Sequence, residues 1–174
     1  DPASPSMQRV LVEAVVTTGF GPVRVLTTHL EYYSRRQREA QIDAIRRLHA
    51  EACAHARRPR QGEGEQGGSF EVFERPVAAM LCGDMNFPAT AAERRLLLAP
   101  YGDGTADWHD SWSLLHGEAA HAPTVGIHEV DWVDRPSCFD FVFLTDDLAP
   151  RLRSHQVNAA TAASDHQPVW IELA

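Results

Sequence analysis

The pattern of apolar and polar positions divides the chain into short β-rich runs and one long helical segment. Residues 10–17 and 23–28 are rich in β-branched side chains, and the Gly- and Pro-containing stretch 19–22 between them is typical of a hairpin turn. From Ser34, a plausible N-cap, apolar residues recur at helical spacing, which predicts a helix over 35–55. Its predicted buried face consists of Ile42, Ile45, Leu48 and Ala52.

Apolar runs predict further strands after this helix. They span 77–82, 139–144, 152–157 and 169–173. Thr90 is positioned to cap a short helix that runs to about Leu98, and a short helix or turn is predicted at 108–112.

Two stretches lack a clear period. Residues 58–76 are rich in Gly, Glu and Gln and are predicted to form a mobile loop. Residues 116–135 are predicted to form a long surface excursion. Together the elements indicate a single α/β (α+β) domain over 1–174 with a mixed or antiparallel sheet.

Composition narrows the class of protein. The chain has 174 residues, 44% of them hydrophobic, and a net charge of −8, with Arg as its only positively charged residue apart from His. The acidic balance argues against a protein that grips long nucleic acid, because such proteins use basic stripes. No apolar run approaches a transmembrane span, and the first residues do not resemble a signal peptide. Cys53, Cys82 and Cys138 lack metal-binding spacing, which mildly favours a reducing, cytoplasmic compartment.

The strongest chemical signal follows the run 77–82, where the sequence reads Gly83-Asp84-Met85-Asn86. Side chains at i and i+2 point the same way as a strand ends, so Asp84 and Asn86 are expected to project together. A carboxylate holds a metal or positions a water, and an amide donates to an anionic oxygen. This short motif alone is also an ordinary turn.

Other polar residues at predicted strand ends extend this set. Asp140 lies between two Phe residues, where a carboxylate needs a partner, and the imidazole of His166 is the obvious candidate. His29 ends another strand, and Asp165 is positioned to serve a divalent cation. Oxygen ligands suit Mg²⁺ or Mn²⁺ better than zinc, so the set predicts metal-assisted hydrolysis of a phosphoester.

In order and content these motifs resemble the endonuclease/exonuclease/phosphatase (DNase I-like) superfamily. The matching segments are Thr28-His29-Leu30, Arg38 with Gln41, Gly83-Asp84-Met85-Asn86-Phe87, Asp110-Ser111-Trp112 with Thr124, Phe139 to Phe143, and Ser164-Asp165-His166 with Pro168. The resemblance implies a sandwich of two β-sheets flanked by helices.

The resemblance also implies residue roles. Asp84 would orient the nucleophilic water, Asn86 would contact the scissile phosphate, and His166, supported by Asp140, would stabilise the transition state. His29 would lie near the scissile phosphate, and Asp165 would assist the metal or the water.

Two family motifs, an early strand with an Asn and a Glu that is the principal Mg²⁺ ligand, are not found before His29. We therefore expect the C-terminal part of such a domain, without the N-terminal strands. We expect it to be inactive alone, and to self-associate through an exposed sheet face.

Several alternatives stay open. The substrate is a phosphodiester or phosphomonoester, with nucleic acid, phospholipid and small molecules all candidates. A second function class is a non-catalytic phosphate- or protein-binding module of the same fold. Asp110 is interpreted as a helix cap or a structural acid, and His116, His121 and His128 lack the paired spacing of a zinc site.

Overall fold

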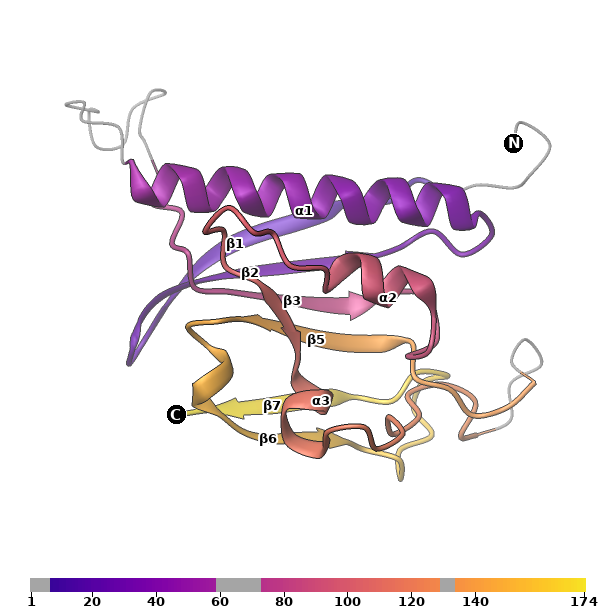
Figure 1. Ribbon diagram of the computed structural model, residues 1–174. Helices are drawn as coiled ribbons and strands as arrows, with labels where there is room; N and C mark the ends of the chain where they lie inside the picture. The colour runs from indigo at the N-terminus through magenta and orange to yellow at the C-terminus, as the bar shows by residue number, and fades with distance from the viewer. Residues whose placement is uncertain (1–6, 59–72, 129–133) are drawn as a thin grey trace.

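A five-stranded mixed sheet forms the centre of the molecule, and the computed structural model describes residues 7–58, 73–128 and 134–174 (Figure 1). The sheet has the strand order β1-β2-β3-β5-β4. These strands span Leu11–Thr18 (β1), Gly21–His29 (β2), Ala79–Asp84 (β3), Trp108–Asp110 (β4) and Asp140–Thr145 (β5). Only β2 and β3 run parallel, and the other neighbours are antiparallel.

A second, two-stranded sheet pairs β6 (Leu152–Val157) with β7 (Val169–Leu173). The helices are α1 (Arg35–Arg57), α2 (Ala92–Leu97) and α3 (Ser111–His116), and a 3₁₀ turn, η1 (Ala149–Arg151), precedes β6. The β-sandwich flanked by helices that the sequence predicted is confirmed.

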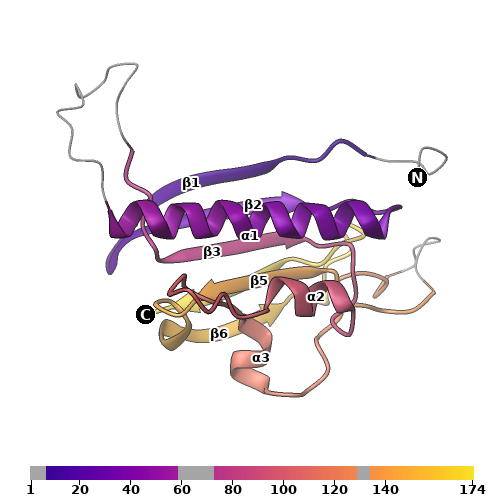
Figure 2. The same ribbon diagram turned by 45° about the horizontal axis from the view of Figure 1, so that its top comes forward.

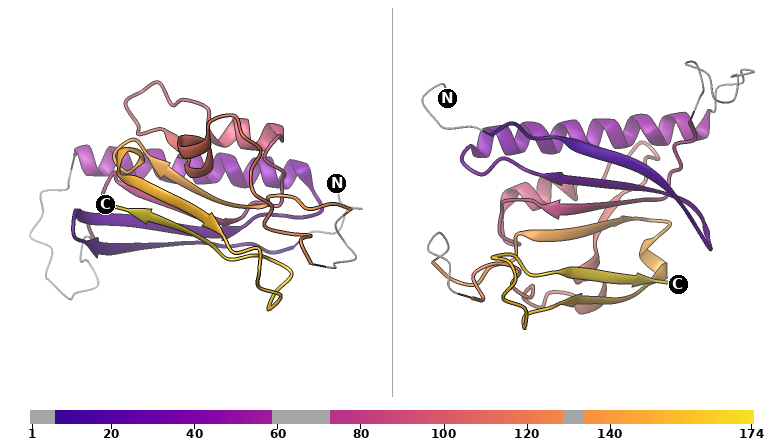
Figure 3. Two further views of the ribbon diagram at one scale, coloured as in Figure 1. Left: turned by 90° about the horizontal axis from the view of Figure 1, so that it is seen from below. Right: turned by 180° about the vertical axis from the view of Figure 1, so that it is seen from behind.

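The two faces of the large sheet bury different partners. On one face Ile42 and Ile45 of α1 and Leu97 of α2 pack on Leu81 and Phe143. On the other face the hairpin β6–β7 packs on the side of the sheet that contains β5, where Leu152 contacts the cluster around Val142 and Leu144. Figure 2 and Figure 3 show this layering, and from behind β1 and β2 lie beside the hairpin rather than beneath it.

Helix α1 confirms the predicted helix and corrects one residue of its face. Ser34 is the N-cap, and its hydroxyl accepts the N–H of Gln37 at 3.4 Å. Leu48, expected on the buried face, is 39% exposed, whereas His49 beside it is fully buried. The helix turns His49 inward because a buried Arg24 side chain of β2 needs an acceptor there: its Nη2 lies 2.7 Å from His49 Nδ1.

The other predicted strands are confirmed, whereas one predicted helix cap is wrong. The hairpin β1–β2 and the strands β3, β5, β6 and β7 are confirmed within two residues of their predicted bounds. Thr90 does not cap α2, whose N-cap is Ala91 and has no side-chain hydrogen bond. Asp110 is a cap as interpreted, since its side chain accepts the N–H of Trp112 in the first turn of α3.

The structure describes the two segments that lack a hydrophobic period to different extents. The loop predicted over 58–76 lies largely on residues 59–72, outside the described residues. The surface excursion predicted over 116–135 is wrong at its centre, because Thr124 and Val125 are 1% and 0% exposed. Within the described part of the chain, no helix is long and apolar enough to cross a membrane.

Candidate active site

The site begins with three side chains that form one row across the sheet. At the ends of their strands, His29 of β2 is paired with Asp84 of β3, and Asp84 is paired with Asp140 of β5. Residues paired across neighbouring strands project from the same face. Three motifs that are far apart in the sequence therefore come together at one edge of the sheet.

His166 joins this row from the loop before β7. Its Nδ1 lies 2.9 Å from Asp140 Oδ2, and its Nε2 lies 3.7 Å from Asp84 Oδ2. His29 Nε2 approaches the same Asp84 oxygen at 3.2 Å. A carboxylate behind one ring nitrogen fixes the tautomer, so Nδ1 carries the proton and Nε2 is directed to the side of Asp84.

Thr124 holds the carboxylate of Asp140, a role that the sequence reasoning did not give it. Its hydroxyl donates to Asp140 Oδ2 at 2.6 Å and accepts the backbone N–H groups of Phe139 and Asp140, both at 3.1 Å. The segment around Thr124 also pairs with the His166 loop, since the N–H of Gln167 donates to the Thr124 carbonyl at 2.7 Å. Thr124 thereby ties Asp140 and His166 together.

The turn after β3 depends on a glycine and a left-handed residue. Gly83 has φ +142°, and a Cβ there would collide with the Thr28 carbonyl oxygen of the neighbouring strand. Asn86 has φ 51°, and its N–H donates to Asp84 Oδ1 at 2.8 Å. These contacts fix the orientation of the Asp84 carboxylate.

The side chain of Asn86 has a structural partner. Its Nδ2 donates to the Leu30 carbonyl at 2.7 Å, and the residue is 8% exposed. Asn86 therefore links the end of β2 to the turn after β3, and contact between this amide and a phosphate stays a prediction.

Asp84 is electrostatically unusual. Burial raises the pKa of its carboxyl above the ordinary value of 3.8, and the charge of Asp140 adds to this, although the Asn86 N–H and the two histidines oppose it. A carboxylate with a raised pKa is a better proton acceptor for water. Perturbed acids in such clusters mark candidate catalytic sites.

The donor types fit a divalent cation. Ligand atoms of Asp84, Asp140 and His166 lie within 4.8 Å of one another, and this is the one such group among the described residues. Two carboxylates match the protein ligands that Mg²⁺ typically has, with water and substrate oxygens supplying the rest. Asp165 is exposed and outside this group, and its carboxylate receives the hydroxyl of Ser164 at 3.3 Å. Its role as a metal ligand stays a prediction.

A second polar cluster lies around Asp110. Its Oδ2 accepts Arg94 Nε at 2.7 Å and lies 2.9 Å from His121 Nε2. Asp110 is 4% exposed, and despite this burial its bonds to His121 and Arg94 lower its pKa. This cluster anchors the segment that leads to Thr124, so it supports the site without belonging to it.

Comparisons with solved structures identify the fold. An endonuclease/exonuclease/phosphatase from Bacteroides vulgatus superposes with a TM-score of 0.65 at 15% identity, over 95% of this chain and 54% of that protein. The Bacteroides thetaiotaomicron mannosyl-6-phosphatase Bt3783 gives 0.54 at 16% identity, over 88% of this chain and 51% of that one. D. rerio TDP2 complexed with a single-strand DNA product gives 0.60 at 18% identity, over 97% and 65%.

The chain thus has the fold of endonuclease/exonuclease/phosphatase proteins and spans about half the length of the first two neighbours. A comparison of the sequence with models of protein families finds no match. A comparison with curated proteins also finds none.

Proposed function

We propose that this chain carries the phosphate-binding and water-activating part of a divalent-metal-dependent phosphoesterase. The observation that carries the proposal is the row His29–Asp84–Asp140 with His166 held against it. The fold it shares with an endonuclease/exonuclease/phosphatase, a mannosyl-6-phosphatase and TDP2 supports a phosphoester as substrate.

Each residue has a role that its contacts allow. Asp84 orients the attacking water beside its Oδ2, the oxygen that both histidines approach. His166, fixed by Asp140 through Nδ1, directs Nε2 toward the phosphoryl oxygens that gain charge, and His29 lies on the other side of Asp84. We assign Asn86 to the phosphate as well, through the part of its amide that Leu30 does not occupy.

Two carboxylates of this site would hold the metal. Asp84 and Asp140 would hold Mg²⁺ or Mn²⁺, with Asp165 as a further candidate from the adjacent loop. A bound divalent ion supplies positive charge that neutralises the phosphate and lowers the pKa of water. The Glu motif that supplies the principal Mg²⁺ ligand in the superfamily this sequence resembles is not found before His29, so we propose that the chain alone turns over substrate slowly or not at all.

The test combines binding and turnover. Calorimetry with Mn²⁺ and inorganic phosphate should show binding that Asp84→Ala and His166→Ala each weaken by about tenfold or more. His109→Ala is the matched control, because this His pairs with Asp146 away from the site. Hydrolysis of bis-p-nitrophenyl phosphate with Mg²⁺ or Mn²⁺ is measured in parallel.

The outcomes separate the claims. Turnover that disappears in Asp84→Ala supports the phosphoesterase, and rapid turnover by the chain alone contradicts its expected inactivity. Phosphate binding without turnover favours the non-catalytic phosphate-binding module. Binding that is unchanged in both site variants contradicts the site itself.

A further inference from the structure

Strand β1 is the exposed edge of the large sheet. It pairs with β2 on one side without a register shift, and no described residue pairs with its other side. An edge strand presents unpaired N–H and C=O groups that can bind another strand. Figure 3 shows β1 at the side of the sheet that the β6–β7 hairpin does not cover.

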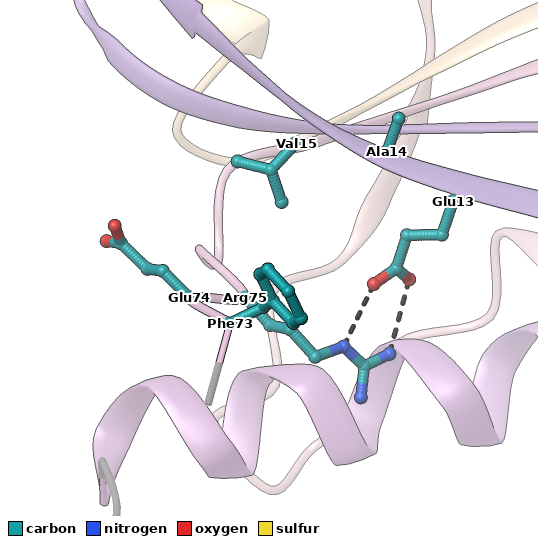
Figure 4. Close-up of a pocket in the computed structure, with 6 residues that line it drawn as sticks. All are labelled: Glu13, Ala14, Val15, Phe73, Glu74 and Arg75. Atoms are coloured by element: carbon teal, nitrogen blue, oxygen red, sulfur yellow. Dashed lines mark hydrogen bonds and ion pairs between the residues drawn. The ribbon is translucent and has the colours of Figure 1, made fainter. Parts of the chain in front are cut away.

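Most side chains of β1 are apolar, and exposed ones lie on both faces. Val12 and Val16, 53% and 46% exposed, share the face that looks toward the β6–β7 side, with Ala14 between them. Val15, 44% exposed, lies on the opposite face beside Phe73, which is 76% exposed. These two line a hollow of about 530 Å³ with Glu13 and Arg75 (Figure 4).

This edge lacks most of the usual protection. Natural edge strands avoid association with Lys, Pro, bulges or inward-pointing charges, and β1 contains none of the first three. Its one charged side chain, Glu13, bonds Arg75 at 2.9 Å and Arg24 at 3.1 Å on the helix side of the sheet. The charge of Glu13 is therefore paired on the helix side of the sheet.

We propose that β1 pairs antiparallel with β1 of a second copy of this chain, joining the two sheets into one. A two-fold axis perpendicular to the sheet requires a register that leaves opposed residues on the same face. With Ala14 opposite Ala14 of the second copy, Val12 lies opposite Val16 of the second copy. Such β-branched cross-strand pairs stabilise a sheet.

The register centred on Glu13 and the edge of β7 are less favourable. Shifting the centre to Glu13 places two like charges directly opposite each other, which destabilises the pair. The free edge of β7 is shorter, five residues against eight, and Glu172 is exposed on it. The pairing of β1 is independent of the proposed chemistry, since the catalytic row does not contain a β1 residue.

Sedimentation velocity of the 174-residue chain over a wide concentration range tests the pairing. We expect a concentration-dependent shift from 19.3 kDa toward the mass of a dimer. Val12→Lys and Val16→Lys should each weaken dimerisation by roughly tenfold or more, because a charge then opposes an apolar partner. Trp170→Lys on β7, at the same 46% exposure as Val16, should leave it unchanged.

The register has its own test. Under oxidising conditions Ala14→Cys should cross-link to its own copy across the pair, and Val16→Cys, which faces Val12 of the second copy, should not. A monomer at all concentrations overturns the proposal. A dimer that is dissociated by Trp170→Lys but not by Val12→Lys or Val16→Lys also overturns it. Equal cross-linking of the two Cys variants overturns the proposed register.

Discussion

At the scale of single residues, hydrogen bonds between neighbouring side chains and backbone groups hold the candidate site together. Thr124 bonds Asp140, Asp140 bonds His166, and the Asn86 N–H bonds Asp84. Each catalytic candidate thus has at least one oxygen or nitrogen fixed by a neighbour. Such supporting contacts determine whether a functional group lies within the narrow geometry that catalysis requires.

Thr124 is the positioning residue with the clearest prediction. Thr124→Val keeps the shape but removes the donor to Asp140 and the acceptor for two backbone N–H groups, so it should cost about 1–3 kcal/mol of stability. It should also weaken phosphate binding measured by calorimetry with Mn²⁺. Thr124→Ser keeps the hydroxyl and should restore the binding. Loss of binding in the Ser variant as well would contradict a role through this hydrogen bond.

The Asp84 carboxylate is expected to destabilise the folded state at neutral pH. Its raised pKa means that the folded state binds the proton more tightly than the unfolded chain, so stability falls as the pH rises through the window above 3.8. Asp84→Asn should therefore raise the stability and the Tm at pH 7. Thermal unfolding between acid and neutral pH measures this, with the two proteins converging at low pH. A lower Tm for the variant at pH 7 would refute the argument.

At the scale of elements, close contact between β2 and β3 forms the site. Gly83 allows this contact because only a residue without Cβ fits against the Thr28 carbonyl, at a positive φ that L side chains rarely adopt. The parallel pair then ends with His29 beside Asp84. The close approach of the two strands at Gly83 thereby aligns two side chains of the candidate site.

Gly83→Ala tests this coupling. The new methyl group must displace Thr28, so we expect a loss of more than about 3 kcal/mol of unfolding free energy. Gly19→Ala is the matched control, because nothing lies within 4 Å of a Cβ at Gly19. It should change stability by less than about 1 kcal/mol. Urea unfolding compares the two, and equal effects would show that the close approach is not required.

The contact of α1 with β2 predicts that the unfolding free energy depends on pH. Burial lowers the pKa of His49 from 6.5 to about 4, with Arg24 adding to the shift, so the ring stays neutral in the fold. The unfolded chain takes up this proton first, so the stabilisation is present above pH 6.5 and is lost as the pH falls toward 4. Between pH 7 and pH 5 we expect a loss of roughly 2 kcal/mol.

Two variants on the same helix isolate this contribution. His49→Gln cannot titrate and should flatten the pH dependence measured by urea unfolding. His55→Gln, an exposed His of α1, should keep the wild-type slope. An unchanged slope in His49→Gln would place the pH dependence elsewhere.

At the scale of the whole molecule, the features that could be predicted from the sequence are those that local patterns determine. Strand and helix periods are local, so β1, β2 and α1 followed from spacing. The pair Asp140–His166 followed from the rule that a buried carboxylate needs a partner. Thr124 and His49 did not follow, because their importance depends on tertiary partners: an irregular segment brought against β5, and an Arg that α1 covers. An apolar pattern does not predict a buried hydrogen-bonded histidine.

The charge of the whole chain predicts weak binding to long nucleic acid. With a net charge of −8, the chain repels the dense negative charge of long nucleic acid, and this repulsion is much smaller for the small phosphate of the proposed site. Fluorescence anisotropy should give a Kd for duplex DNA weaker than roughly 10⁻⁴ M at physiological salt. The exposed Arg36 in the first turn of α1 provides a test for DNA binding by a local basic surface. Tight binding that weakens steeply with salt and is reduced in Arg36→Ala would show that a local basic surface outweighs the net charge.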